Sequence, residues 1–222
     1  MRIWLCEGAE GILINSGVIT GAHPVLVESI AIIQESAALC GLRLYWTLLD
    51  GHSSRDTNDP VTRAIMSEPE HTARFAELVA APIATRLDRR LTVGVEVINE
   101  PEALMTDDGR RDEEQWRKCP VAIKAIGDAV RAARSGTMVT AGTDRAMLAM
   151  LWNNAPGLDA VDIHVKGDQQ LPSRADVIRE LGIALVQAES IPLIGGYRGD
   201  GAEQTHRADY NAIFRWCLEP KT

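Results

Sequence analysis

The stretch TVGVEVINEPE, residues 92–102, decides the fold of this 222-residue chain. Its β-branched residues form a short apolar run, which is typical of a strand buried on both faces in a parallel sheet. Pro101 ends this strand, because proline has no N–H to donate to a strand ladder. Asn99 and Glu100 therefore lie at the carboxyl end of a buried strand, where catalytic groups collect in a (β/α) barrel.

Strand-like and helix-like segments alternate on both sides of this stretch. Strict alternation implies right-handed crossovers and a parallel sheet, and no break in composition marks a linker. We therefore predict a single α/β domain over residues 1–222. The other strands are expected at 2–6, 42–49, 138–143, 160–165 and 191–194, and the helices at 23–40, 60–90, 114–134, 145–152, 172–189 and 203–218.

Glycines and prolines mark the expected interruptions. Residues 8–21 and 195–201 are predicted to be glycine-rich loops, and residues 106–113 an acidic, polar loop. Pro69 and Pro82 are expected to interrupt the helical region 60–90, because proline breaks the hydrogen-bond pattern inside a helix. No GxGxxG or GxxxxGK[ST] motif follows any strand, so neither nucleotide-binding signature is present.

Charge and composition limit the partners. The formal net charge of −8 and the pI of about 5.2 argue against nucleic acid, which favours a basic surface. No apolar run is long enough for a membrane span, and the N-terminal MRIWLCEG lacks the features of a signal peptide. We therefore expect no membrane partner and, by default, a cytoplasmic protein. The acidic run at 107–114 lacks an EF-hand pattern, so no metal is expected.

The cysteines and several buried side chains are expected to be structural. Cys6, Cys40, Cys119 and Cys217 contain no CxxC pair. Cys6 and Cys40 lie in apolar segments, which favours buried free thiols over disulfides. Two tryptophans in strands, Trp4 and Trp46, are expected in the core.

Five segments of the chain resemble, in order, strands of the retaining glycoside hydrolases of clan A. This (β/α)8 group includes the family five cellulases and mannanases. The segments are RIWL at 2–5, LLDGH at 48–52, VINEP at 97–101, DIH at 162–164 and IPLIG at 191–195. The resemblance implies a TIM-type barrel that acts on or binds β-linked oligo- or polysaccharides without a metal or organic cofactor.

The resemblance also implies roles for individual residues. Glu100 corresponds to the general acid/base, and Asn99 to the amide that contacts the sugar 2-hydroxyl. His52 and His164 correspond to hydrogen-bonding groups on the substrate side, and Arg2 to the arginine that helps hold the nucleophile. Retaining hydrolysis uses two carboxyl groups about 5–5.5 Å apart. The acid/base role requires a raised pKa, from burial or from a second carboxylate.

The position of the second carboxylate carries a glycine. The seventh strand of the family reads apolar-Gly-Glu, and here Gly196 occupies the nucleophile position. Asp200, Glu203 and Glu7 are the nearby carboxylates that could replace it. The alternatives are a non-catalytic carbohydrate-binding pseudo-enzyme, or an engineered form whose nucleophile was removed.

The two ends of the resemblance carry a further expectation. The family has one strand before the segment at 2–5 and one after the segment at 191–195, and neither has a counterpart here. About six parallel strands would leave an incomplete barrel with two open edges. A homo-oligomer through these edges is therefore expected. Glu96 shares strand parity with Glu100, so we expect it to point inward toward a buried partner such as an arginine, in a structural role.

Overall fold

A parallel sheet forms the centre of the protein. The computed structural model describes residues 1–52, 59–107, 110–143, 158–166 and 193–198. Its sheet has six strands in the order β1-β4-β5-β8-β9-β10, and all neighbouring strands pair in parallel. The strands are β1 (Arg2–Trp4), β4 (Leu44–Asp50), β5 (Thr92–Asn99), β8 (Val139–Thr143), β9 (Val161–Lys166) and β10 (Leu193–Arg198). The predicted parallel α/β fold is confirmed.

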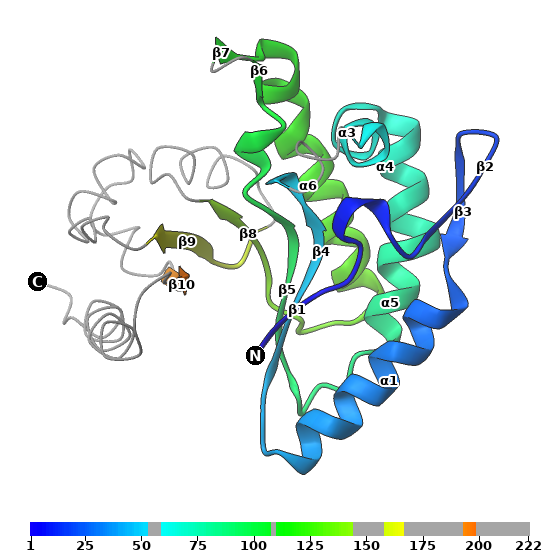
Figure 1. Ribbon diagram of the computed structural model, residues 1–222, viewed down its shortest axis with the longest axis vertical. Coiled ribbons are helices and arrows are strands. Elements are labelled where there is room, and N and C mark those ends of the chain that lie inside the picture. The colour runs from blue at the N-terminus through cyan, green and yellow to red at the C-terminus, as the bar shows by residue number, and fades with distance from the viewer. Residues whose placement is uncertain (53–58, 108–109, 144–157, 167–192, 199–222) are drawn as a thin grey trace, which may run out of the picture.

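The described helices lie on one face of this sheet (Figure 1). The opposite side is the one toward which β9 and β10 turn (Figure 1). Helices on a single face form the outer wall of a (β/α) barrel, whereas a doubly wound sheet carries helices on both faces. The helices are α1 (Pro24–Leu39), α3 (Pro60–Ser67), α4 (Pro69–Phe75), the π-helical turn η2 (Ala76–Ala80), α5 (Ala81–Arg86) and α6 (Glu113–Ala133). The sheet is an incomplete barrel, because β1 and β10 stand at the two ends of the strand order within the described part.

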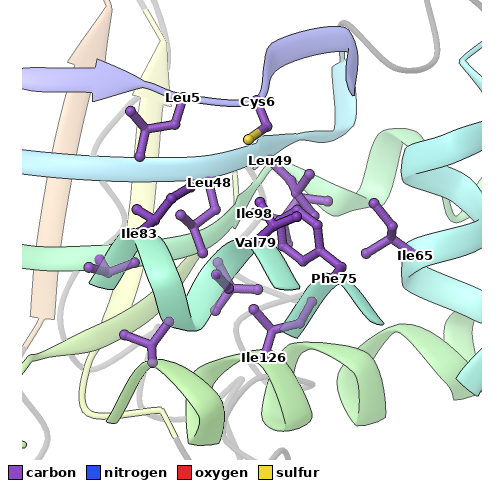
Figure 2. Close-up of a cluster of buried hydrophobic side chains, with 14 of the residues drawn as sticks. Leu5, Cys6, Leu48, Leu49, Ile65, Phe75, Val79, Ile83, Ile98 and Ile126 are labelled. Carbon is purple, nitrogen blue, oxygen red and sulfur yellow. The ribbon is translucent and has the colours of Figure 1, made fainter. Parts of the chain in front are cut away.

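The core lies between the sheet and this layer of helices (Figure 2). Leu48 and Leu49 of β4 and Ile98 of β5 are at most 1% exposed. On the helical side, Phe75 and Val79 are fully buried in the same cluster. Each such side chain contributes about 1.5–3 kcal/mol when it is fully buried. This packing fixes the carboxyl ends of β4 and β5, where the candidate site begins.

The helix boundaries follow the expected start and stop signals. His23 caps α1, since its Nδ1 accepts a hydrogen bond from Val25 N at 3.2 Å. Gly41 follows the helix with a φ of 66°, as expected of a glycine at the C-terminal end. Pro69 separates α3 from α4, as predicted. The α-helical pattern is also interrupted near Pro82, as predicted, because the π-helical turn η2 ends there and Pro82 lies in the first turn of α5.

The prediction of a loop over residues 8–21 is wrong. After a short 3-10 turn, η1 (Glu7–Ala9), the chain forms an antiparallel hairpin of β2 (Ile12–Asn15) and β3 (Val18–Ala22). Ser16 and Gly17 make its two-residue turn with φ of 50° and 78°, the consecutive positive values that a tight hairpin favours. Glycine is typical of loops and also of tight turns, and here Gly17 lies in the turn between two apolar runs that form strands.

Two other predicted loops contain strand. The predicted glycine-rich loop at 195–201 is strand at least as far as Arg198, because β10 continues through both of its glycines. The polar loop at 106–113 contains a two-stranded pair, β6 (Thr106–Asp107) and β7 (Arg110–Arg111).

The predictions of burial were right for two residues and wrong for two. Cys6 and Trp46 are fully buried. Cys40, at the end of α1, is exposed, and Trp4 is 39% exposed because β1 has β4 as its one partner in the described sheet. Burial raises the pKa of the Cys6 thiol to about 12.

Several predictions lie outside the described residues. They are the helices at 145–152, 172–189 and 203–218 and the thiol of Cys217. A single domain over 1–222 stays a prediction for the same reason. Within the described part, no helix combines the length and apolarity that crossing a membrane requires.

Candidate active site

Glu100 lies immediately after β5, in the turn that leads into the 3-10 helix η3 (Pro101–Ala103). Its backbone is left-handed, with φ 42° and ψ 55°, which is uncommon for a residue other than glycine. Its N–H donates to Gly142 O at 2.9 Å, and its carbonyl accepts from Ala103 N at 3.2 Å. The residue is 5% exposed. A buried carboxylate on a strained backbone at a strand end is the kind of outlier that gathers at functional sites.

His52 contacts this carboxylate directly. It follows β4 by two residues, and its Nε2 lies 2.7 Å from Glu100 Oε2. The His52 side chain is 34% exposed, whereas that of Glu100 is 7% exposed. The pair therefore joins a buried carboxyl to a side chain that reaches solvent. Such a pair can exchange protons with a bound ligand and with water.

The amide of Asn99 is held in one orientation. Its Oδ1 accepts from Arg2 Nη2 at 2.8 Å, and its Nδ2 donates to Asp50 Oδ1 at 2.7 Å. Because a guanidinium only donates and a carboxylate only accepts, these partners decide which end of the amide is oxygen. They use one of its two N–H groups and one of its two lone pairs. The amide can therefore present a defined donor and acceptor to a hydroxyl.

Arg2 is part of a polar network that joins three strands. Its guanidinium forms an ion pair with Glu96 of β5, and its Nε donates to Thr47 Oγ1 of β4 at 2.9 Å. Thr47 Oγ1 also contacts Glu96 Oε2 at 2.6 Å. The guanidinium stacks on Trp4 at 4.5 Å from the ring centre. The prediction that Glu96 points inward to an arginine is confirmed, although that arginine, the candidate site residue Arg2, is only partly buried, with its side chain 28% exposed.

The register of the sheet places the two remaining candidates opposite each other. In the β9–β10 pair, Gly196 is the partner of His164. One row of paired residues crosses four strands of the sheet, from Asn99 through Gly142 and Asp162 to Ile194. His164 and Gly196 each lie two residues after the member of this row on their own strand, toward the carboxyl edge of the sheet. The sequence of β10, LIGGYR, contains no carboxylate.

The three carboxylates suggested as replacements have no established place at the site. Glu7 lies at the start of η1, three residues beyond the end of β1, and is exposed. Asp200 and Glu203 lie outside the described residues. The roles suggested for all of the candidate residues and for the replacement carboxylates stay predictions.

Sequence reasoning gave no role to two residues that support the site. Asp50, the last residue of β4, fixes Asn99, and its position before Gly51-His52 at a strand end was an available signal. Glu102 is buried, and its Oε1 accepts from Thr143 Oγ1 of β8 at 3.0 Å.

Glu102 also acts on a thiol of α6. The pKa of Cys119 is raised, first by burial and then by the nearby carboxylate of Glu102. The hydrogen bond to Thr143 therefore ties the segment after Glu100 to β8. In the part of the chain that the structure covers, no group of three or more His, Cys, Asp or Glu side chains is arranged to hold a metal ion.

Solved structures share this fold. No protein-family model matches the chain, and a search of curated proteins found no relative. A β-1,4-mannanase from the sea hare Aplysia kurodai superposes on 96% of this chain and 72% of its own, with TM-score 0.72 and 13% identity. The β-mannanase of the blue mussel Mytilus edulis superposes on 96% of this chain and 79% of its own, with TM-score 0.69 and 14% identity.

A β-1,4-D-mannanase from Cryptopygus antarcticus is also similar. It covers 73% of this chain, with TM-score 0.61 and 17% identity. The chain spans about half the length of this relative, 55%, and a larger share of the two molluscan enzymes. At these identities the comparisons establish the fold, which is that of the (β/α)-barrel glycosidases.

Proposed function

We propose that this protein acts on β-1,4-linked glycans of the mannan class, with Glu100 as general acid/base. The observation that carries the proposal is the buried, strained Glu100, whose carboxylate lies 2.7 Å from His52 at the carboxyl end of a barrel strand. The mannanase neighbours supply the substrate class.

The geometry suits the first step of glycoside cleavage. The carboxylic acid of Glu100 gives its proton to the glycosidic oxygen as the bond to the anomeric carbon breaks. Asn99, oriented by Arg2 and Asp50, hydrogen-bonds the neighbouring sugar hydroxyl. In a retaining reaction a second carboxylate attacks the anomeric carbon, and Glu100 then takes a proton from the water that releases the sugar. Glu7, Asp200 and Glu203 are the candidates for that second group.

The test compares hydrolysis of a manno-oligosaccharide by the parent and by Glu100→Gln. The amide keeps the shape of the side chain but cannot donate the proton. We expect kcat/KM to fall by about 10²–10⁴-fold, the usual contribution of a general acid/base. Glu70→Gln, which changes an exposed carboxylate on α4, is the matched control and should leave the rate unchanged. Equal rates in the parent and Glu100→Gln would overturn the assignment.

A second candidate is a carbohydrate-binding protein without turnover. It is favoured by Gly196, which leaves no carboxylate in β10 between residues 193 and 198. In that case the oligosaccharide should bind in calorimetry, while no product forms. Azide or formate should then be added with an activated aryl β-mannoside. Activity under these conditions alone would indicate a gap at Gly196 that an external anion fills, as in a nucleophile-deleted form.

A further inference from the structure

Gly51 lies against the backbone of Glu100. A Cβ atom at position 51 would lie 2.3 Å from the carbonyl oxygen of Glu100 and 2.9 Å from its carbonyl carbon. It would also lie 3.0 Å from the Cα of Pro101. All three are backbone atoms, so no side-chain rotation relieves the overlap. Only a residue without a Cβ fits here as the structure stands.

Space, rather than backbone conformation, requires this glycine. Gly51 is absent from the glycines with positive φ, so its backbone is one that an alanine can adopt. Glu100, by contrast, has the left-handed φ of 42° while carrying a full side chain. A glycine usually occupies the left-handed conformation in a turn. Here the glutamate has that conformation, and the glycine is needed for the space that it leaves.

The same dipeptide touches Glu100 twice. Gly51 packs on its carbonyl group, and the next residue, His52, contacts its carboxylate at 2.7 Å. The carbonyl is also held by Ala103 N, and the N–H by Gly142 O. A displacement at Gly51 would therefore pass to the Glu100 turn and to the direction of its carboxyl.

We propose that Gly51 is a positioning residue, which sets the direction of the Glu100 carboxyl toward His52 through direct contact with the Glu100 backbone. The catalytic meaning of this contact rests on the proposed function, because Glu100 is the proposed acid/base. The contact itself does not, so it can be tested without a sugar.

The test uses Gly51→Ala with Gly94→Ala as the matched control. Gly94 is a buried glycine of β5 without positive φ, and a Cβ there would meet chiefly the flexible end of Met138, at 2.7 Å. The readout is the NMR signal of the His52 ring, assigned with His52→Gln. Glu100→Gln should shift this signal in the parent and in Gly94→Ala. In Gly51→Ala the shift should shrink by at least about twofold, since coupled residues behave non-additively.

A second measurement covers the case in which Gly51→Ala does not fold. Glu100→Gly widens the range of backbone conformations open to this turn, which can then move away from a Cβ at position 51, so Gly51→Ala/Glu100→Gly should regain a cooperative thermal transition. An unchanged His52 response in Gly51→Ala would overturn the proposal, as would a double variant that stays unfolded. If no glycan binds while the His52 response is lost as expected, the positioning contact stands and the proposed function fails.

Discussion

Glu100 combines a charged side chain with a left-handed backbone, which costs a residue with a Cβ roughly 1–2 kcal/mol. Both Glu100→Ala and Glu100→Gly remove the carboxylate, so their difference isolates the backbone. We expect Glu100→Gly to be more stable than Glu100→Ala by about 1 kcal/mol in urea unfolding. The same pair at Glu102, which lies inside η3, should give the opposite order. If Glu100→Gly were less stable than Glu100→Ala, the backbone at position 100 would not be strained.

The buried thiol of Cys6 makes stability depend on alkaline pH. Its pKa rises from 9.0 to about 12 on folding. Above pH 9 the unfolded thiol loses its proton while the folded thiol keeps it, so the unfolded state binds fewer protons. The free energy of unfolding should therefore fall as pH rises from 9 toward 12.

Cys6 should contribute up to about 1.4 kcal/mol per pH unit to this fall. Urea unfolding between about pH 9 and 10.5 should show a shallower slope for Cys6→Ala than for the parent. Cys40→Ala changes an exposed cysteine and should leave the slope as it is. If the free energy of unfolding fell equally steeply with pH in all three proteins, burial of Cys6 would not be the cause of the fall.

At the scale of elements, α3 depends on one N-terminal cap. Asp59 accepts from Val61 N at 2.8 Å and Thr62 N at 3.2 Å, and also from Thr62 Oγ1 at 2.7 Å. Asp59→Ala should destabilise the protein by about 0.5–2 kcal/mol, the usual cost of losing such a cap. Asp59→Asn keeps an accepting oxygen and should lose much less. Thermal unfolding measures both variants, and equal losses would show that the charge, not the cap, matters.

The elements show what the sequence could and could not predict. The strand within residues 92–102, observed as β5 (Thr92–Asn99), was predictable from local periodicity. The start of α1 at His23-Pro24 was predictable from capping chemistry. The β2–β3 hairpin was missed because glycine marks both loops and tight turns.

The candidate site was predictable as a set of residue types but not as contacts. The burial of Glu96 was foreseen, yet its pairing with Arg2 depends on strands brought together by the fold. The need for a glycine at 51 depends on the approach of Glu100, which no local pattern contains.

At the scale of the molecule, β1 leaves one side of the sheet without a neighbour in the described residues. Met1 O accepts from Tyr45 N, and Leu5 N donates to Thr47 O, so odd-numbered residues face β4. The N–H of Trp4 then points toward the open side, since successive residues alternate. We propose that two copies associate through this edge.

Light scattering over a range of concentrations tests this association. Trp4→Pro removes the N–H on the open side and should give a monomer, because proline cannot donate to an added strand. Trp4→Ala also loses the ring but keeps the N–H, so it should still associate. A parent that stays monomeric at every concentration would contradict the proposal.

The contacts of Arg2 also bear on how the chain folds as it is synthesised. Arg2 is synthesised well before its partners Glu96 and Asn99, which lie 94 and 97 residues further along the chain. Loop closure over such a distance is slow compared with local helix formation. β1 can make these contacts only after β5 has been synthesised and has formed. We therefore expect the docking of β1 to be a late step of folding. The interactions that orient Asn99 then form only once the central strands have come together.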